Sequence, residues 1–323
     1  MEEVTVLRAA PLTTVQDLGR AERRREGVSV GGALDLFAAR VANLLVGNAE
    51  DAALLEITFG GLRLRFNDDR SVAWCGGTFP ARIAEAEFPA GRRAVVRQGE
   101  ELEFDTTKRG GRAWIAMAGG IDIPLVLGSR STDLRSGFGG FAGRALRDGD
   151  LVSLGKAVRG RTDAPRRAAW SAPVDWAQTA MRVPVLRVVH GSEWDEFIPE
   201  AQTTFLKQLF TVTANADRMG ARLEGAELRR TNHWELPSEA VAPGTVQVAH
   251  DGQPIVLLGD CQTIGGYPKI AHVITVDLPR AAQLRPNDTV RFQEVTVAEA
   301  NTLFAEREKD LQRFRVALSL RTG

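Results

Sequence analysis

Short apolar runs with a period of two recur along the whole chain and indicate β-strands. The segment 62–66, LRLRF, alternates leucine or phenylalanine with arginine, which is typical of a strand with one buried face. The segment 112–120, RAWIAMAGG, likewise places Ala113, Ile115 and Met117 on one face. Further β-branched runs that glycine, proline or aspartate closes cover 184–190, 245–249, 254–260 and 272–278.

Helical periodicity is found in two segments. The first follows Asp35 and ends at Gly47, as expected of a polar N-cap and a terminal glycine. Its apolar face comprises Leu34, Phe37, Val41, Leu44 and Leu45. The second begins at Thr296, which is spaced to form a capping box with Glu299. Its inward positions are predicted to be Leu303, Phe304, Leu311 and Phe314. Strands do not alternate with helices here, so the predicted fold class is mainly β with a few helices rather than a doubly wound sheet.

One short pattern occurs three times, at 97–104, 147–154 and 285–292. Each copy has arginine, any residue, glycine or asparagine, an acidic residue, any residue, and then two apolar residues with a period of two. Glycine and asparagine tolerate the positive φ that a tight turn requires. The pattern therefore predicts a turn that leads into a strand. Its copies are unevenly spaced, which argues against a solenoid and favours β-barrel units, with a copy closing each half of the chain.

The chain of 323 residues exceeds the usual size of one hydrophobic core, so two domains are expected. We predict an N-terminal domain over 1–156, a linker over 157–183 and a C-terminal domain with a terminal helix over 184–323. The linker segment is rich in arginine, alanine and proline and lacks periodicity. Its two tryptophans, Trp170 and Trp176, indicate that parts of it pack on a domain.

Composition narrows the class of protein. Lysine plus arginine equals aspartate plus glutamate, at 41 each, which gives no sign of a nucleic-acid or membrane partner. The two cysteines form no disulfide framework and fit a reducing compartment. The N-terminus lacks the pattern of a signal peptide, and no apolar run approaches the length of a membrane span. We expect a cytoplasmic protein.

Several common catalytic motifs are absent from the sequence. It contains no phosphate-binding P-loop, no dinucleotide-binding glycine motif, no H-E-x-x-H or C-x-x-C, and no G-x-S-x-G elbow. The four histidines stand apart in the sequence, so no metal site is expected. An enzyme with this sequence would act through carboxylates, arginines, amides and loop backbone.

Polar clusters of that kind occur in the N-terminal half. The segment TTVQDLGR supplies a neutral amide in Gln16, a carboxylate in Asp17 and a guanidinium in Arg20. The glycine-rich loop that ends at Asp35 opens a helix, where N–H groups attract anions, although Asp35 also fits a plain N-cap. The loop 128–144 combines glycines with Arg130, Asp133, Arg135 and Arg144; either it binds an anion or another chain, or it is a surface loop.

The C-terminal half contains the segment 260–271, DCQTIGGYPKIA, directly after a predicted core strand. It places an amide, two adjacent glycines, the only tyrosine of the chain and a lysine together: Gln262, Gly265, Gly266, Tyr267 and Lys269. Glycines allow the backbone to approach a flat ligand, and a glutamine both donates and accepts hydrogen bonds. A glycine hairpin with the tyrosine packed on the end of a barrel is the structural alternative. A second polar segment, 216–223, contains Asp217 and Arg218.

Three other features have simpler interpretations. Glu56 interrupts an apolar strand and is either paired in the core or directed into a cleft. Cys261 is interpreted as a small buried apolar residue. The basic segment 20–26, RAERRRE, is interpreted as a solvated loop, with phosphate capture as the alternative.

Taken in order, these clusters resemble one family. The segments TTVQDLGR, GSRSTDLRSGFGGFAGRALRDGD, DRMGARL, GQPIVLLGDCQTIGGYPKIA and DLPRAAQLRPND occur in the order found in the carboxyltransferase subdomain, or allophanate hydrolase subunit 2, family. The resemblance extends from about residue 7 to about residue 295. It implies two cyclophilin-like β-barrel domains. It also implies a smaller partner, a B-like (kinase-inhibitor-like) protein, that shares the active site.

The resemblance also implies an activity. We expect a subunit of an ATP-dependent 5-oxoprolinase, in which ATP with Mg²⁺, bound mainly at the partner interface, phosphorylates a lactam and a third protein, a hydrolase, completes ring opening to glutamate. The expected catalytic residues are Gln16, Asp17, Asp217, Gln262 and Tyr267. The expected substrate- or phosphate-binding residues are Arg20, Asp35, Arg130, Asp133, Arg135, Arg218, Gly265, Gly266 and Lys269.

Two alternatives stay open on the sequence. One is a carboxyltransferase or allophanate hydrolase subunit of urea metabolism, although the chain has no segment for biotin attachment. The other is a non-catalytic antagonist that binds a kinase-inhibitor-like protein. The chain departs from the family pattern at Gly31, Ala216 and Ile264, where a hydroxyl is usual. One missing hydroxyl typically costs about 0.5–1.5 kcal/mol, enough to change specificity.

Overall fold

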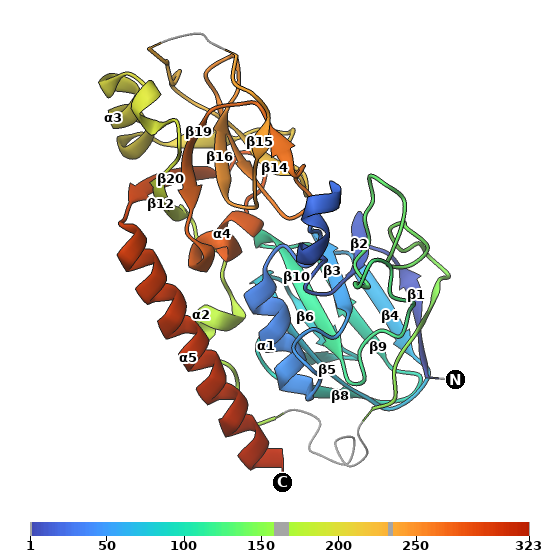
Figure 1. Ribbon diagram of the computed structural model, residues 1–323. Coiled ribbons are helices and arrows are strands. Elements are labelled where there is room, and N and C mark those ends of the chain that lie inside the picture. The colour runs from blue at the N-terminus through green and yellow to red at the C-terminus, as the bar shows by residue number, and fades with distance from the viewer. Residues whose placement is uncertain (1, 158–167, 232–234, 323) are drawn as a thin grey trace. The chain divides into compact units, whose positions relative to one another are not determined.

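The computed structural model describes residues 2–157, 168–231 and 235–322. The chain divides into two compact units (Figure 1). The first unit comprises Met1–Arg20, Gly31–Ala180 and Ala317–Gly323, and the second comprises Ala21–Val30 and Met181–Val316. A short N-terminal segment therefore belongs to the second unit although the residues on both sides of it belong to the first.

The first unit consists of two antiparallel sheets that enclose one hydrophobic core. Among the described residues, one sheet has the order β11-β1-β4-β9-β6-β7 and the other the order β2-β3-β10-β5-β8. The strands are β1 (Glu3–Arg8), β2 (Leu12–Gln16), β3 (Leu54–Thr58), β4 (Leu62–Phe66), β5 (Arg70–Thr78), β6 (Ala81–Ile83), β7 (Ala86–Glu87), β8 (Ala94–Val96), β9 (Glu101–Phe104), β10 (Arg109–Met117) and β11 (Leu151–Ser153).

The helix α1 (Leu36–Val46) lies across β5 and β10 of the second sheet (Figure 1). Its ends are those that the sequence predicts: Asp35 Oδ1 accepts from Ala38 N at 2.7 Å, and Gly47 has the left-handed φ of 81°. The shared face predicted for Ala113, Ile115 and Met117 of β10 is confirmed, although it is not the only buried face of this strand. Its Ala113 face lies in the core between the sheets, but the opposite face is buried as well because α1 packs on it.

The second unit contains a closed barrel, which in the described residues has the strand order β12-β19-β16-β17-β14-β13-β20. The strands are β12 (Val185–His190), β13 (Phe210–Val212), β14 (Gly220–Glu224), β16 (Thr245–Val248), β17 (Pro254–Leu257), β19 (Lys269–Val273) and β20 (Thr289–Glu294). A separate pair joins β15 (Glu239–Ala240) to β18 (Ile264–Gly265). Buried Phe205 stacks on Phe292 with ring centroids 4.3 Å apart, and Phe210 packs against both.

Further helices complete the two units. The α-helices are α2 (Val174–Ala177), α3 (Pro199–Lys207), α4 (Leu278–Ala282) and α5 (Val297–Thr322), and the 3₁₀ helices are η1 (Ala21–Glu26), η2 (Trp194–Glu196) and η3 (Thr275–Asp277). The capping box of α5 is confirmed, since Thr296 N donates to Glu299 Oε2 at 2.7 Å and Glu299 N to Thr296 Oγ1 at 3.1 Å. Phe304, predicted to point inward, is 45% exposed, whereas Leu311, two turns later on the same face of α5, is buried, so the packing that covers Leu311 does not extend to Phe304.

The mainly β fold class is confirmed, with a closed barrel in one unit and a two-sheet core in the other. The repeated turn-and-strand pattern is confirmed at each copy: Gly99, Gly149 and Asn287 have φ of 83°, 88° and 71°. In each, the following acidic side chain accepts from the backbone N–H of the first arginine. The run 272–278 is strand only as far as Val273 and then turns into η3.

The expected domain boundaries stay a prediction. Residues 158–167 of the expected linker lie outside the described residues. Residues from Ala168 to Ala180 belong to the first unit, where Trp176 meets Phe37 of α1 edge to face with centroids 5.1 Å apart. This packing agrees with the presence of tryptophans in that segment.

Candidate functional site

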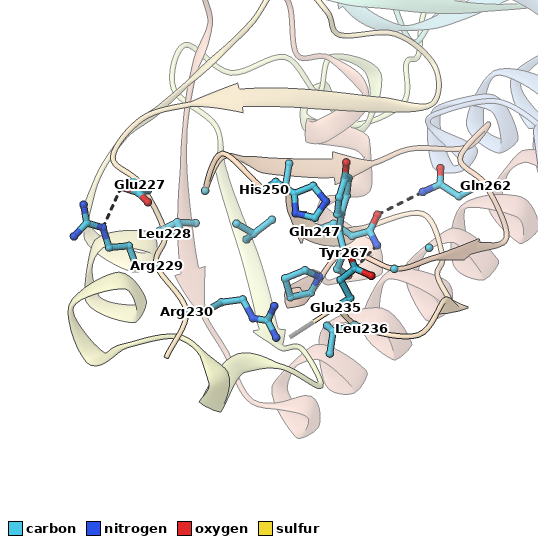
Figure 2. A pocket seen from close by; sticks show the side chains of 16 residues that line it. Glu227, Leu228, Arg229, Arg230, Glu235, Leu236, Gln247, His250, Gln262 and Tyr267 are labelled. Atoms are coloured by element: carbon cyan, nitrogen blue, oxygen red, sulfur yellow. Dashed lines mark hydrogen bonds and ion pairs between the residues drawn. The ribbon is translucent and has the colours of Figure 1, made fainter. Parts of the chain in front are cut away.

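A cavity of about 670 Å³ opens in the second unit (Figure 2). Three segments line it: 227–236, the end of β16 with the loop after it, and 262–268. The lining residues are Glu227, Leu228, Arg229, Arg230, Glu235, Leu236, Gln247, Val248, Ala249, His250, Gly252, Gln262, Gly265, Gly266, Tyr267 and Pro268. Four residues of the predicted C-terminal cluster are therefore together at one cavity: Gln262, Gly265, Gly266 and Tyr267.

The lining of the cavity includes a pair of amide side chains. Gln247 projects from β16 and is 1% exposed. Its Nε2 donates to the backbone oxygen of Tyr267 at 3.1 Å, and its Oε1 accepts from Gln262 Nε2 at 3.4 Å. Figure 2 shows the two amides facing each other beside the tyrosine ring. The sequence-based prediction missed Gln247, although a lone glutamine inside the apolar run TVQVA is the signal that marks it.

Glycine at position 265 is required by this amide pair. A Cβ added to Gly265 would lie 2.8 Å from Gln247 Nε2 and 3.3 Å from Gln262 Nε2. Gly265 belongs to β18, whose partner strand β15 holds it in register opposite Glu239. The glycine therefore leaves the space above the amides open, as expected of a position where the backbone comes close to other groups.

Tyr267 and His250 form one wall of the cavity. Their rings meet edge to face with centroids 5.2 Å apart (Figure 2). Tyr267 also packs against a small apolar cluster that contains buried Cys261 and Leu257. The packing proposed as the structural alternative for Tyr267 is therefore present, and the tyrosine lines the cavity as well. Cys261 is 4% exposed, so the interpretation of a small buried residue is confirmed, and burial raises the pKa of its thiol to about 11.

Lys269 is not among the residues that line the cavity. It is 6% exposed, and its Nζ lies 2.7 Å from Glu239 Oε2 and 3.4 Å from Glu193 Oε2. Burial would lower the pKa of Lys269, but the two carboxylates outweigh it and raise the pKa. The lysine therefore ties β15 to β19 at the edge of the site, and its charge is neutralised there.

Asp217 and Arg218 support the loop that carries Gln262. Asp217 Oδ1 accepts from the backbone of Met219 and Gly220 at 2.7 and 3.1 Å, which closes a tight turn. Arg218 forms a two-pronged ion pair with Asp260, at 2.8 and 3.0 Å, two residues before Gln262. Such paired, planar bonds fix direction as well as distance. From the N-terminal segment, Ser29 Oγ donates to the oxygen of Asp260 at 3.4 Å.

A second cluster of predicted residues lies in the first unit, around Asp17. This buried carboxylate accepts from Ser129 Oγ and Ser131 Oγ, each at 2.6 Å, from Gly19 N at 2.8 Å and from Arg130 N at 2.5 Å. Four donors occupy both oxygens, so within this unit Asp17 fastens the loop 129–132 to the end of β2. Its catalytic role stays a prediction.

The other predicted residues of the first unit bond mainly to backbone. Arg20 donates to the oxygen of Ser131 at 2.6 Å, and Arg130 Nε to the oxygen of Ile123 at 2.8 Å. Gln16 is fully buried and bonds to Thr14 and to the oxygen of Thr132, while its Oε1 has no hydrogen-bond partner among the described residues.

The remaining positions of the loop 128–144, and Asp35, have local roles. Asp133 Oδ1 accepts from Ser136 N at 2.9 Å within the loop, and Arg135 is exposed. Asp35 is the N-cap of α1. These contacts explain local geometry, and they leave the predicted binding of phosphate as a prediction.

Glu56 is paired in the core and is not directed into a cleft, which decides between the two interpretations of the sequence. Glu56 is 1% exposed, and its Oε2 accepts from Leu34 N at 2.9 Å and from Trp114 Nε1 at 2.8 Å. Of the departures from the family pattern, Gly31 has φ of 62°, where glycine is favoured over serine. Ile264 is 59% exposed and does not line the cavity.

Within residues 2–157, 168–231 and 235–322, no group of three or more histidine, cysteine, aspartate or glutamate side chains is placed to hold a metal ion. No helix in the described part of the chain is long and apolar enough to cross a membrane. His233, one of the four histidines, lies outside the described residues.

Comparison with known proteins identifies the family to which a chain with this fold and these polar sites belongs. The chain belongs to the family of the carboxyltransferase domain, subdomain A and B, whose model matches residues 26–294. It is 39% identical to the C subunit of 5-oxoprolinase from Escherichia coli over 98% of this chain and 97% of that protein. It is 35% identical to the C subunit of 5-oxoprolinase from Haemophilus influenzae, over 97% of each.

A solved structure has the same fold. The crystal structure of Kluyveromyces lactis urea carboxylase superposes with a TM-score of 0.89 at 28% identity, over 97% of this chain and 29% of that one. The present chain therefore corresponds to one part of a larger protein in that relative, and to nearly the whole of the two bacterial relatives.

Proposed function

We propose that this chain is the C subunit of an ATP-dependent 5-oxoprolinase. The observation that carries the proposal is the match along nearly the full length of both partners to two bacterial proteins of that name, at 39% and 35% identity. A match of this extent covers both units. The urea amidolyase of Lachancea kluyveri matches at 30% identity over only 17% of its length, so this chain corresponds to a small part of that protein.

The chemistry agrees with the lining of the cavity. A lactam is a poor electrophile, and transfer of the γ-phosphoryl group of ATP to its carbonyl oxygen turns that oxygen into a leaving group. This step depends on positioning and charge stabilisation more than on a covalent nucleophile. The described lining offers amides, an aromatic wall and glycine backbone, which are groups that orient a small planar amide.

The nucleotide and its Mg²⁺ are proposed to bind mainly with the partner. The cavity contains Arg229 and Arg230, but Glu227 pairs with the first at 3.0 Å and Glu196 pairs with the second. Each arginine is thus already paired with a carboxylate of this chain. We therefore propose that a B-like (kinase-inhibitor-like) protein supplies the main contacts to ATP and that a third protein, a hydrolase, completes ring opening.

Reconstitution with purified proteins tests this function. The chain is mixed with the B-like protein and the third protein encoded by the same organism, and ADP and glutamate are measured with and without 5-oxoproline. We expect both products only when all three proteins, ATP and 5-oxoproline are present. A stable complex that forms no ADP in response to 5-oxoproline would contradict the proposal.

Carboxyl transfer to urea is the second candidate, and the fold match to urea carboxylase favours it. A carboxylated biotin carrier supplied as a separate protein, with urea as acceptor, distinguishes the two activities. Carboxyl transfer to urea without 5-oxoproline turnover would favour this alternative. A third outcome would favour a non-catalytic antagonist: this chain binds the B-like protein tightly and inhibits it, and neither substrate is turned over.

A further inference from the structure

The orientation of the amide pair follows from simple bonding rules. The backbone oxygen of Tyr267 accepts hydrogen bonds and cannot donate them, so Gln247 must turn its amide nitrogen toward it. The oxygen of Gln247 then faces Gln262, which must present its own nitrogen in return. The direction of both amides is therefore set by one carbonyl group of the backbone, without reference to any ligand.

This arrangement leaves a donor and an acceptor on Gln262. One N–H of its amide is used by Gln247, and the other remains. No residue of the described part of the chain donates to Gln262 Oε1, and Gln262 lines the cavity. An acceptor oxygen beside a donor N–H is complementary to a ligand that has its own N–H and C=O on the same edge.

A lactam has such an edge because its ring holds the amide in the cis form. We propose that Gln262 binds the amide edge of the ligand in this cavity, with Oε1 accepting from the ligand N–H and Nε2 donating to the ligand carbonyl. Gln247 is the positioning residue that holds Gln262 in this orientation. The choice of a lactam as the ligand rests on the proposed function; the orientation of the amide pair does not.

Two neighbouring features fit this proposal. Gly265 keeps clear the space above both amides, since a Cβ there would lie within 3.3 Å of both nitrogens. The rings of Tyr267 and His250 form a wall beside them. A small flat ring can therefore approach the edge of Gln262 while its face lies against the aromatic wall.

The test compares 5-oxoproline with the γ-lactone of 2-hydroxyglutarate, which has an oxygen in place of the ring N–H. The two probes have the same ring size and the same carboxylate. Binding of each to the complex of this chain with its B-like partner is measured by calorimetry. In the wild type we expect 5-oxoproline to bind at least about 10-fold more tightly, because the lactone brings an acceptor against the acceptor Oε1.

Substitutions then locate the origin of this ratio. Gln262→Met keeps a side chain of similar length but removes both the acceptor oxygen and the donor N–H, and it should bring the ratio of affinities near unity. Gln247→Leu leaves Gln262 in place without its orienting partner and should reduce the ratio at least about threefold. Gln293→Met, at an exposed position on β20, is the matched control and should leave the ratio unchanged. Melting temperatures establish that each variant is folded.

The outcomes separate this inference from the proposed function. Equal binding of lactam and lactone by the wild type, or an unchanged ratio in Gln262→Met, overturns the amide-edge proposal even if 5-oxoproline is turned over. Absence of binding of 5-oxoproline to the complex overturns it as well. A preference for the lactam that Gln262→Met abolishes, in a complex that forms no ADP, supports the site and contradicts the proposed activity.

Discussion

Asp17 and Ser131, 114 residues apart in sequence, hydrogen bond to each other twice. Ser131 Oγ donates to Asp17 Oδ1 at 2.6 Å and accepts from Asp17 N at 3.0 Å. With Ser129 and the backbone of Arg130, the carboxylate joins the end of β2 to the loop 129–132. A buried carboxylate that satisfies so many donors is expected to contribute strongly to the stability of the first unit.

Asp17→Asn should lower the free energy of unfolding by about 2–3 kcal/mol, because an amide nitrogen would face a donor that it cannot accept from. Urea unfolding measures the change. Asp51→Asn, at an exposed position, should stay within about 0.5 kcal/mol of the wild type. A stability of Asp17→Asn equal to that of the control would show that the bonds of Asp17 are dispensable. Turnover per folded complex then tests the separate prediction that Asp17 is catalytic.

Substitutions in the buried ion pair between Asp277 and Arg187 should also lower the free energy of unfolding strongly. Asp277 is fully buried and accepts from Arg187 Nε at 2.8 Å, from its Nη2 at 2.7 Å and from its backbone N at 2.9 Å. Asp277→Asn leaves the guanidinium without its counter-charge and should cost about 3 kcal/mol. Asp310→Asn removes an exposed pair with Arg313 and should cost less than about 0.5 kcal/mol. The free energy of unfolding is measured in urea for both variants. Equal decreases in Asp277→Asn and Asp310→Asn would contradict the prediction that the buried pair contributes more to stability.

At the positive-φ position of the recurring turn, alanine should destabilise the protein, whereas exchange between asparagine and glycine should have little effect on stability. Gly149 has φ of 88° and open space where a Cβ would lie, so Gly149→Ala introduces only backbone strain, about 1 kcal/mol. Gly99→Ala should cost the same for the same reason. Asn287→Gly, at the third copy, should change stability by only a few tenths of a kcal/mol, since both residues accept the positive φ. Thermal unfolding of the three variants is the measurement, and an unchanged melting temperature for both alanine variants would contradict the prediction.

His272 should make the stability of the second unit depend on pH. Burial, and after it the charge of Lys269, lower the pKa of His272, while Glu193 acts in the opposite direction. A lowered folded-state pKa means that the unfolded chain binds more protons as the pH falls below about 6.5. The contribution is therefore complete above that pH and is lost as the pH falls through the folded pKa.

His272→Gln keeps a group that can bond to Thr245 Oγ1, which lies 3.2 Å from the imidazole, and removes the titration. Urea unfolding between about pH 5 and pH 7 should show a smaller dependence on pH in this variant than in the wild type. The carboxylates whose pKa values are lowered, Glu193 among them, titrate below this window. An identical slope in both proteins would exclude His272 as the source.

The sequence predicted the kinds of side chain that line the cavity, but it did not predict all of the residues that lie there. Gln262, Gly265, Gly266 and Tyr267 are neighbours in the chain, and they line one cavity as neighbours should. Gln247 was not predicted, because it contacts Tyr267 only when β16 pairs with β19. The register of that pairing shifts at Gln247. A local pattern contains no information about such a register.

Polar residues that are typical of catalysis illustrate the same limit. Asp17 and Arg218 have side chains that a site for an anion or a metal would use, yet in their own units the first fastens a loop and the second holds Asp260. Whether a carboxylate faces a ligand or a set of protein donors depends on which loop folds back onto it. The serines that meet Asp17 lie 112 and 114 residues further along the chain.

What the sequence by itself determined is local: the period-two strands, the caps of α1 and α5, the positive-φ turns and the mainly β class. Each depends on interactions within a few residues, and backbone sterics and hydrogen bonding act there in the same way in any fold. Only the tertiary structure decided that β10 is buried on both faces, that Glu56 is paired in the core and that Gln247 orients Gln262. These depend on contacts between distant segments, which form only when the strands find their partners and exclude water.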